Sequence, residues 1–527
     1  MSFEIRERDL LARIGRLKTK SGVIETPALL PVINPAIQLI MPKTISQEFG
    51  CKALITNAYI IKKHFQDEAI KKGIHRLLGF DGVVMTDSGG YQILVYGDVK
   101  VTNKGIVHFQ EQIQTDIATM LDVPTGWGVS QQYAQRTVNE TSRRARELER
   151  IKTRDDITWV GPVQGGTYLN LVAKSAEEMG KLPFRIHALG SPTPVMEQYL
   201  FNTLVDMILT AKQHLPLERP LHLFGAGHPF MFSLAVALGC DLFDSAAYAI
   251  YAREDRYMTE SGTARLRELN YFPCSCPLCV RSSPENALEM SKTEKQIFLA
   301  KHNLYVCFSE IRRIKQAVAE GRLWEHLQIR VHGHPALLQA LKKLEKYGDY
   351  LEENSPVSKP SGLFFYNSVD LIRPEIVRHR KRLSQRYFPP KEAKILILLP
   401  QTKTKPFHKS RELMKTVKMI HRKLGDKMRF VHVCAYAAPF GVIPMDLDEI
   451  YPLSQHETAT PFDDETINYV AEQVKNYVYS KHYEKVILVE DNEMWKKKIA
   501  SACKKISKEK KISLSLYRMK NHGTNAR

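Results

Sequence analysis

Strand-like segments that end on polar or glycine residues and lead into helical segments recur along residues 53–250. This repetition constrains the fold more than any other feature of the sequence. The expected strands lie in residues 53–61, 83–94, 116–126, 157–168, 184–192 and 221–244. Parallel βα units that repeat at this spacing favour a closed (β/α)8 TIM barrel, which is an α/β fold. An open doubly wound sheet is the alternative.

The clearest βα unit is the stretch Leu221–Arg256. It contains a short apolar strand, a Gly-Ala-Gly turn at 225–227, an almost wholly apolar helical segment and a second strand that ends on Asp244. The glycines allow a tight turn and a close approach of the backbone to a ligand. A carboxylate at the C-terminal end of a barrel strand lies where barrel enzymes place their chemistry, so Asp244 is a candidate catalytic residue. A structural aspartate that caps the following turn is the alternative.

Other expected strands also end on polar or small residues. An apolar run reaches Asp87, which Ser88 and two glycines follow, and Tyr91 is placed to stack on a planar ligand. An ordinary Asp-Ser-Gly turn is the alternative there. The full set of strand-end candidates is Asp87, Ser88, Asp122, Gln164, Gly190 and Asp244. Such donors, acceptors and carboxylates suit a small heterocycle that is bound through its edge, whereas a phosphate would require a glycine-rich loop with a basic residue.

Three of the eight cysteines, Cys274, Cys276 and Cys279, lie within six residues and predict a metal site rather than a disulfide framework. His302 is the expected fourth ligand, with Cys307 as a rival. A closed set of four ligands predicts one structural Zn²⁺ with no open position for water. Reduced thiols without a metal are the alternative. This use of cysteine fits a reducing cytoplasm.

The formal net charge of +19 over 527 residues favours a polyanionic partner, with nucleic acid ahead of a membrane surface. A merely soluble basic protein is the alternative. The charged N-terminus lacks the apolar core of a signal peptide, and no apolar run is long enough for a membrane span. We therefore expect a cytoplasmic protein with no membrane partner.

We expect three domains. Residues 1–325 form the catalytic barrel with an inserted zinc site, residues 326–390 a small basic helical or α+β connection, and residues 391–527 a small open α/β domain with a lysine-rich end. The connection carries basic residues that could contact nucleic-acid phosphates or form a solvated helix face: Arg378, Arg380, Lys381, Arg382 and Arg386. After the α/β domain only a short polar tail remains, so we expect no small β-barrel module of the PUA type in this chain.

Together these motifs resemble the tRNA-guanine transglycosylase family over roughly residues 1–325. The matching motifs are MTDSGGYQ, LDVPTG, VQGG, ALGS, FGAGHP, DLFDSAAYA and CSCPLC, with His302 downstream. The resemblance implies a zinc-bearing (β/α)8 barrel in which Asp244 is the nucleophile that attacks the ribose C1′. It implies that Asp87 is the general acid and base, and that the zinc ligands are Cys274, Cys276, Cys279 and His302. The positions implied to hold the base are Ser88, Tyr91, Asp122, Gln164 and Gly190.

The DSGGYQ and ALGSPTP segments and the C-terminal extension are similar to the archaeal branch of that family. The resemblance then implies exchange of guanine 15 in the tRNA D-arm for 7-cyano-7-deazaguanine (preQ0), an early step of archaeosine biosynthesis. We also expect a homodimer, and a separately encoded PUA-domain protein is a candidate partner. Two alternatives remain: a noncatalytic tRNA-binding relative or partner subunit, and a zinc-stabilised barrel hydrolase or lyase that acts on a small heterocycle.

Overall fold

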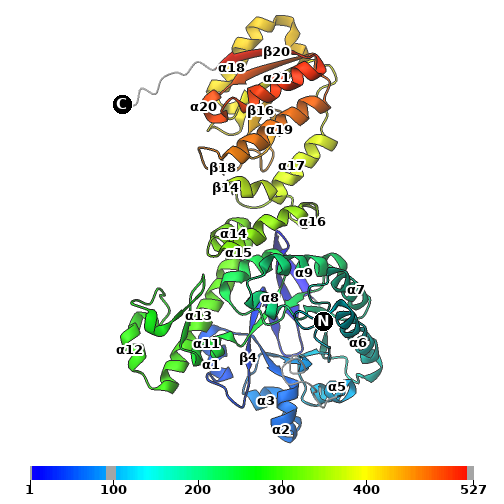
Figure 1. Cartoon of the computed structure of the whole chain (residues 1–527), viewed down its shortest axis with the longest axis vertical. Coiled ribbons are helices and arrows are strands. Elements are labelled where there is room, and N and C mark those ends of the chain that lie inside the picture. The colour runs from blue at the N-terminus through cyan, green and yellow to red at the C-terminus, as the bar shows by residue number, and fades with distance from the viewer. Residues whose placement is uncertain (1–2, 91–101, 519–527) are drawn as a thin grey trace. The chain divides into compact units, whose positions relative to one another are not determined.

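Eight parallel strands close into a barrel in the N-terminal part of the chain (Figure 1). Their order around the barrel is β10-β11-β4-β5-β6-β7-β8-β9. The strands are β4 Ala28–Ile33, β5 Ala53–Asn57, β6 Val83–Asp87, β7 Ile117–Thr119, β8 Thr158–Val163, β9 Ile186–Leu189, β10 Leu221–Leu223 and β11 Leu242–Ser245. Buried apolar side chains from neighbouring strands, among them Leu30, Ile55, Met85 and Leu242, pack into one core cluster of the barrel. The predicted α/β barrel is confirmed.

The computed structural model describes residues 3–90 and 102–518. The chain divides into two units, residues 1–344 and 345–527. The three-domain division drawn from the sequence remains a prediction. None of the described helices is long and apolar enough to cross a membrane.

The N-terminal β-rich segment has two roles. Its first part is a three-stranded antiparallel sheet of β1 Phe3–Asp9, β2 Ala12–Lys18 and β3 Val23–Thr26. The next strand, β4, pairs in parallel with β5 and β11 and so completes the barrel. The repeated strand-and-helix pattern seen in the sequence begins only at β5, because β4 follows directly on the small sheet without a helix between them.

Helices follow the strands and cover the barrel. They are α1 Pro42–Phe49, α2 Ala58–Lys72, α3 Ile74–Leu78, α5 Asn103–Gln112, α6 Gln131–Ile151, α7 Leu169–Gly180, α8 Thr193–Glu197, α9 Phe201–His214, α10 Phe232–Ala237 and α11 Ala247–Arg253. The short 3₁₀ helix η1, Pro229–Met231, leads into α10. All six residues of α10 are buried, as its almost wholly apolar sequence predicts.

The remainder of the first unit surrounds the cysteine cluster and continues as helices. Its elements are β12 Arg256–Met258, β13 Thr263–Arg265, η2 Leu266–Glu268, η3 Cys279–Arg281, α12 Pro284–Glu289, α13 Lys292–Ala319, α14 Leu323–Val331 and α15 Pro335–Lys343. The longest of these helices, α13, begins with a capping box in which Ser291 and Glu294 satisfy each other's backbone N–H groups. It contacts α11, β12 and α14, so it joins the cysteine region to the barrel wall.

The second unit is built on a five-stranded sheet of order β17-β16-β15-β19-β20, in which only β17 is antiparallel to its neighbour. The strands are β15 Ile395–Pro400, β16 Val431–Ala437, β17 Gly441–Pro444, β19 Lys485–Glu490 and β20 Ser513–Arg518, and β14 Leu363–Phe365 pairs separately with β18 His456–Thr458. All six residues of β15 are buried, and successive ones belong to different apolar clusters on the two faces of the sheet. The predicted open α/β domain is confirmed.

The other elements of the second unit are α helices and short 3₁₀ segments. They are η4 Leu344–Tyr347 at its boundary, α16 Gly348–Asn354, η5 Ser368–Ile372, α17 Pro374–Gln385, η6 Phe407–Lys409, α18 Arg411–Leu424, η7 Gly425–Phe430, α19 Asp464–Ser480, α20 Asn492–Trp495 and α21 Lys498–Lys510.

Candidate active site

Asp244 lies near the C-terminal end of β11, beside the glycine turn that follows β10. The imidazole Nε2 of His222 is 2.9 Å from Oδ1 of Asp244, and the backbone N–H of Gly225 donates to the same oxygen at 2.9 Å. His222 is fully buried, whereas the Asp244 side chain keeps 14% of its surface exposed. Among the described residues, none donates a hydrogen bond to Oδ2. One carboxylate oxygen is thus held in place, and the other is open to a ligand.

Asp87 ends β6 and enters the same mouth of the barrel. Asn57 donates to its Oδ2 through Nδ2 at 2.9 Å, and the Gly89 N–H lies 3.3 Å from that oxygen. Burial raises the pKa of Asp87 to about 7, and the carboxylates of Asp122 and Asp244 act in the same direction. Near neutral pH this carboxyl group is therefore able both to give and to take up a proton.

Asp122 and Gln164 form a fixed pair between the ends of β7 and β8. Gln164 donates through Nε2 to Oδ2 of Asp122 at 2.6 Å, and its Oε1 accepts from the Thr125 N–H at 3.0 Å. Burial raises the pKa of Asp122 to about 6, and the bond from Gln164 opposes that rise. The amide of Gln164 also accepts from the Ser191 hydroxyl at 3.2 Å, and these bonds orientate it, so the pair can present a defined pattern of donors and acceptors.

Two glycines make room for this pair. A Cβ atom on Gly190 would lie 2.2 Å from Nε2 of Gln164, and one on Gly90 would lie 2.3 Å from Oδ1 of Asp122. No side chain fits at either position while the pair stays in place. This explains the glycine at the end of β9 that the sequence marked as a site position.

Ser88 is 1% exposed, and its hydroxyl has no hydrogen-bond partner within the part of the chain that the structure describes. A buried hydroxyl without a partner costs free energy unless a ligand completes its hydrogen bond. The structure therefore brings together Asp87, Ser88, Asp122, Gln164, Gly190 and Asp244. Tyr91, the expected stacking residue, lies outside the described residues.

The four predicted metal ligands converge. One ligand atom from each of Cys274, Cys276, Cys279 and His302 lies within 4.8 Å of the other three. Nδ1 of His302 faces the thiols at 3.3 Å from Cys279 and 3.7 Å from Cys276, while its Nε2 lies 2.9 Å from the carbonyl oxygen of Met258. A carbonyl that receives the second ring N–H fixes the tautomer that a metal-bound histidine needs. Three thiols and one imidazole fit a tetrahedral structural site.

Cys307, the rival ligand, does not join this cluster. Its buried Sγ contacts the carbonyl oxygen of Gly227 at 3.6 Å and Sδ of Met258 at 3.8 Å. Tyr257 instead completes the surroundings of the cluster, because its ring stacks on His302 with a centroid distance of 3.6 Å and its hydroxyl lies 3.3 Å from Cys279 Sγ.

Comparison with known proteins identifies the family. A family model described as queuine tRNA-ribosyltransferase matches residues 9–336, and a second model, for a domain of unknown function, matches residues 376–525. A tRNA-guanine(15) transglycosylase of Methanocaldococcus jannaschii is 44% identical over 88% of this chain and 69% of its own length. A protein of the same name from Saccharolobus solfataricus is 41% identical over 92% of this chain and 96% of its own length.

The chain belongs to the tRNA-guanine transglycosylase family. Membership confirms the resemblance seen in the motifs, including the similarity to archaeal members, and it confirms the predicted enzyme class, a transglycosylase. The roles assigned to individual site residues remain predictions, although their convergence at one end of the barrel is what such roles require.

The sequence did not indicate two residues that the structure places in contact with the carboxylates. His222 and Asn57 bond Asp244 and Asp87 respectively. Both belong to the strands of the barrel: His222 is the middle residue of β10, and Asn57 is the last residue of β5. Their position on strands next to those of the carboxylates could have marked them once the barrel order was known.

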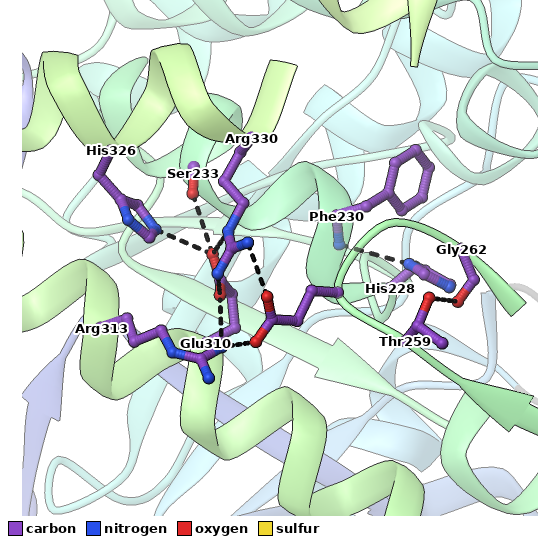
Figure 2. A network of polar contacts seen from close by, with 10 residues as sticks. His228, Phe230, Ser233, Thr259, Gly262, Glu310, Arg313, His326 and Arg330 are labelled. Carbon is purple, nitrogen blue, oxygen red and sulfur yellow. Dashed lines mark hydrogen bonds and ion pairs between the residues drawn. The ribbon is translucent and has the colours of Figure 1, made fainter. Parts of the chain in front are cut away.

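A polar network in this transglycosylase is centred on the buried carboxylate of Glu310 (Figure 2). Glu310 of α13 is fully buried and accepts hydrogen bonds from Ser233 at 3.2 Å and His326 at 2.9 Å. Arg330 bonds both of its oxygens, at 2.8 and 2.6 Å. Burial acts to raise the pKa of Glu310, but the bonds from His326 and Arg330 outweigh it and hold the pKa at about 2.

The network continues to the turn between β12 and β13. Arg330 also donates to Glu260 at 2.8 Å, and Arg313 pairs with the same carboxylate. Figure 2 shows His228 of the FGAGHP motif beside this turn, with its Nδ1 accepting from the Phe230 N–H. The network thus connects α10, α13 and α14 to the segment that leads to the cysteine cluster.

Proposed function

We propose that this enzyme exchanges guanine 15 of the tRNA D-arm for preQ0 through a covalent aspartyl-ribose intermediate, an early step of archaeosine biosynthesis. The observation that carries the proposal is the pairing of two carboxyl groups with different environments in one barrel mouth. Asp244 has one open, partly exposed oxygen, whereas Asp87 is desolvated and has a pKa near neutrality. A nucleophile and a proton carrier need these two environments.

In the first displacement, the open oxygen of Asp244 forms a bond to C1′ of the ribose as the bond between C1′ and the guanine nitrogen breaks. The electron pair leaves with guanine, which takes up the proton of Asp87. Guanine is a poor leaving group, so protonation of the departing base and covalent capture of the sugar divide one difficult step into two easier ones.

In the second displacement, Asp87 accepts the proton of the ring nitrogen of the incoming base. That nitrogen bonds to C1′, and the ester bond to Asp244 breaks, which restores both carboxyl groups to their starting states. The hydroxyl of Ser88, the Asp122–Gln164 pair and the backbone at Gly190 are the groups we assign to the edge of the base. The same pocket then binds both guanine and preQ0, since the two bases present the same hydrogen-bonding edge to these groups.

Zinc is the metal we assign to the cysteine cluster. Its four protein ligands leave no position for substrate, so its contribution is to the fold of the segment between β13 and α13. The alternative of a noncatalytic tRNA-binding relative is disfavoured because both carboxylates are present and lie at the barrel mouth.

The test combines unmodified tRNA with preQ0 and measures the base at position 15 by nucleoside mass spectrometry. The wild-type chain should incorporate preQ0 and release guanine. An Asp244→Ala variant should bind tRNA but give neither exchange nor a denaturant-resistant protein–tRNA adduct. Formation of that adduct by Asp244→Ala would refute the assigned nucleophile.

Asp241 is the nearest rival carboxylate in the sequence, and its surroundings argue against such a role. It is 1% exposed, accepts from Nε of Arg13 at 3.0 Å and from the Leu221 N–H at 2.8 Å, and precedes β11 at the opposite end of the strand from Asp244. This end of a barrel contributes stability rather than chemistry.

A further inference from the structure

A cavity of about 260 Å³ lies within the second unit, between α17 and the segment that joins β17 to β18. Helix α17 and the residue after it contribute Arg382, Leu383 and Arg386, and the facing segment contributes the apolar residues Ile450 and Pro452. This volume is slightly below the ~300–1,000 Å³ typical of small-molecule sites, so the cavity has room for a ligand of about the size of a single base and not for a much larger one.

Two basic residues of α17 have partners within the second unit. Arg378 is buried and donates to Glu352 at 2.9 Å and to the carbonyl of Pro356 at 2.8 Å. Lys381 pairs with Asp349 at 2.8 Å and with Glu352 at 3.2 Å. Arg378 therefore holds the fold together, and of the two possibilities drawn from the sequence, phosphate contact does not apply to it.

Arg382 and Arg386 differ from these residues. Both are exposed, and within residues 3–90 and 102–518 neither side chain makes an ion pair or a hydrogen bond. They lie in the last turn of α17 and directly after it, and both line the cavity. The carboxylate that lines the same cavity, Glu375, is already paired with Lys359 at 2.6 Å. The cavity therefore presents two uncompensated guanidinium groups.

The opposite wall is apolar and open at its rim. Ile450 is 55% exposed and Val357 is 58% exposed, although both are large aliphatic residues beside a cavity. An arginine pair recognises phosphate oxygens, and an apolar or aromatic wall accepts the face of any base. An acidic protein segment would pair with the charges of the arginines but would not account for the apolar wall.

We propose that this cavity holds one unstacked nucleotide of the tRNA substrate, with its phosphates on Arg382 and Arg386 and its base against Val357 and Ile450. The proposal takes only the tRNA substrate from the proposed function and does not depend on the exchange chemistry. It gives the second unit a direct role in holding the RNA.

The test measures tRNA binding by the full-length chain across a series of salt concentrations. The double variant Arg382→Gln/Arg386→Gln should bind about tenfold or more weakly at low salt, because two phosphate contacts are lost. Its plot of log K against log salt should be shallower by roughly 1.4, at about 0.7 per phosphate of a single strand. The matched control is Lys415→Gln/Lys418→Gln, which removes two exposed charges from α18 of the same unit and should leave binding and slope unchanged.

A second variant tests the apolar wall without a change of charge. Val357→Trp places a large ring at the rim, so it should weaken tRNA binding severalfold while the salt slope stays as in the wild type. Melting temperatures equal to that of the wild type establish that the variants are folded. Binding by the arginine double variant that matches the lysine control would overturn the proposal.

Two further outcomes separate this inference from others. If GMP occupies the cavity while tRNA binding is independent of both arginines, the site belongs to a free nucleotide and the RNA assignment fails. If the wild type shows no preQ0 exchange but its tRNA binding depends on Arg382 and Arg386, the proposed function fails and this inference stands.

Discussion

His222 Nε2 lies 2.9 Å from Asp244 Oδ1, and this contact determines which oxygen of the carboxylate is free to react. The Gly225 N–H donates to the same oxygen, so Oδ1 carries two hydrogen bonds, whereas none of the described residues donates to Oδ2. The Nδ1 of His222 is buried and has no partner among the described residues. A proton on Nε2 lets the ring donate to Asp244.

Removal of this donor should therefore affect the chemical step more than tRNA binding. For His222→Phe we expect kcat of exchange to fall by about 10- to 100-fold, as for loss of one positioned hydrogen bond at a reacting group, with KM for tRNA unchanged. His222→Gln, which keeps an N–H donor, should recover most of the rate. Equal rates for the two variants would show that the side chain acts only through packing.

The barrel and most of its mouth could be predicted because the signals are local. Each strand of an α/β barrel is a short apolar run, and the polar residue that follows it, such as Asp87 or Gln164, marks the catalytic end without knowledge of its neighbours. The three cysteines of the metal cluster lie close together in the sequence, and only the position of the fourth ligand depends on the fold. The structure places His302 there because α13 passes the cluster with that face inward.

Contacts between distant segments could not be predicted in this way. The partner of His222 is determined by the parallel register of β10 on β11, in which His222 lies opposite Leu242. The network at Glu310 joins residues from three helices and a turn, and on α13 a glutamate among basic residues looks like a solvated ion pair. Arg378 likewise resembled its exposed neighbours until the fold placed it against Glu352.

The cysteine cluster should control stability rather than base specificity. Cys276→Ala removes one of the four ligands, so we expect loss of bound zinc and a lower melting temperature or soluble yield, because metal binding supplies folding free energy. The matched control is Cys307→Ala, a buried cysteine outside the cluster, which should retain the metal. A folded, metal-free Cys276→Ala protein with normal exchange would contradict the structural role.

The network at Glu310 should be a second determinant of stability. Glu310→Gln removes the fully buried charge of the network and leaves the part-buried Arg330 with Glu260 alone as a charged partner. Loss of one member of a buried ion pair typically costs about 3–5 kcal/mol of unfolding free energy. Glu260→Gln alters the 40% exposed end of the same network and should cost about 1 kcal/mol or less. Denaturant unfolding of both variants measures the difference, and similar losses would argue against a special role for the buried carboxylate.

Asp87 should make this enzyme less stable as the pH rises. Burial and the carboxylates of Asp122 and Asp244 raise its pKa from 3.8 to about 7 in the folded protein, so between these values the folded chain binds a proton that the unfolded chain releases. This contribution to stability is full below about pH 4 and is lost as the pH rises through about 7, with a maximum near 4 kcal/mol.

Asp87→Asn, which resembles the protonated form, should therefore melt at a higher temperature than the wild type near pH 8 and at a similar temperature near pH 4, although it loses exchange activity. Asp155→Asn, at a 98% exposed carboxylate, is the control and should show no such dependence. If Asp87→Asn gave the same stability difference at both pH values, the raised pKa would be wrong, and with it the assignment of Asp87 as the group that carries the proton at neutral pH.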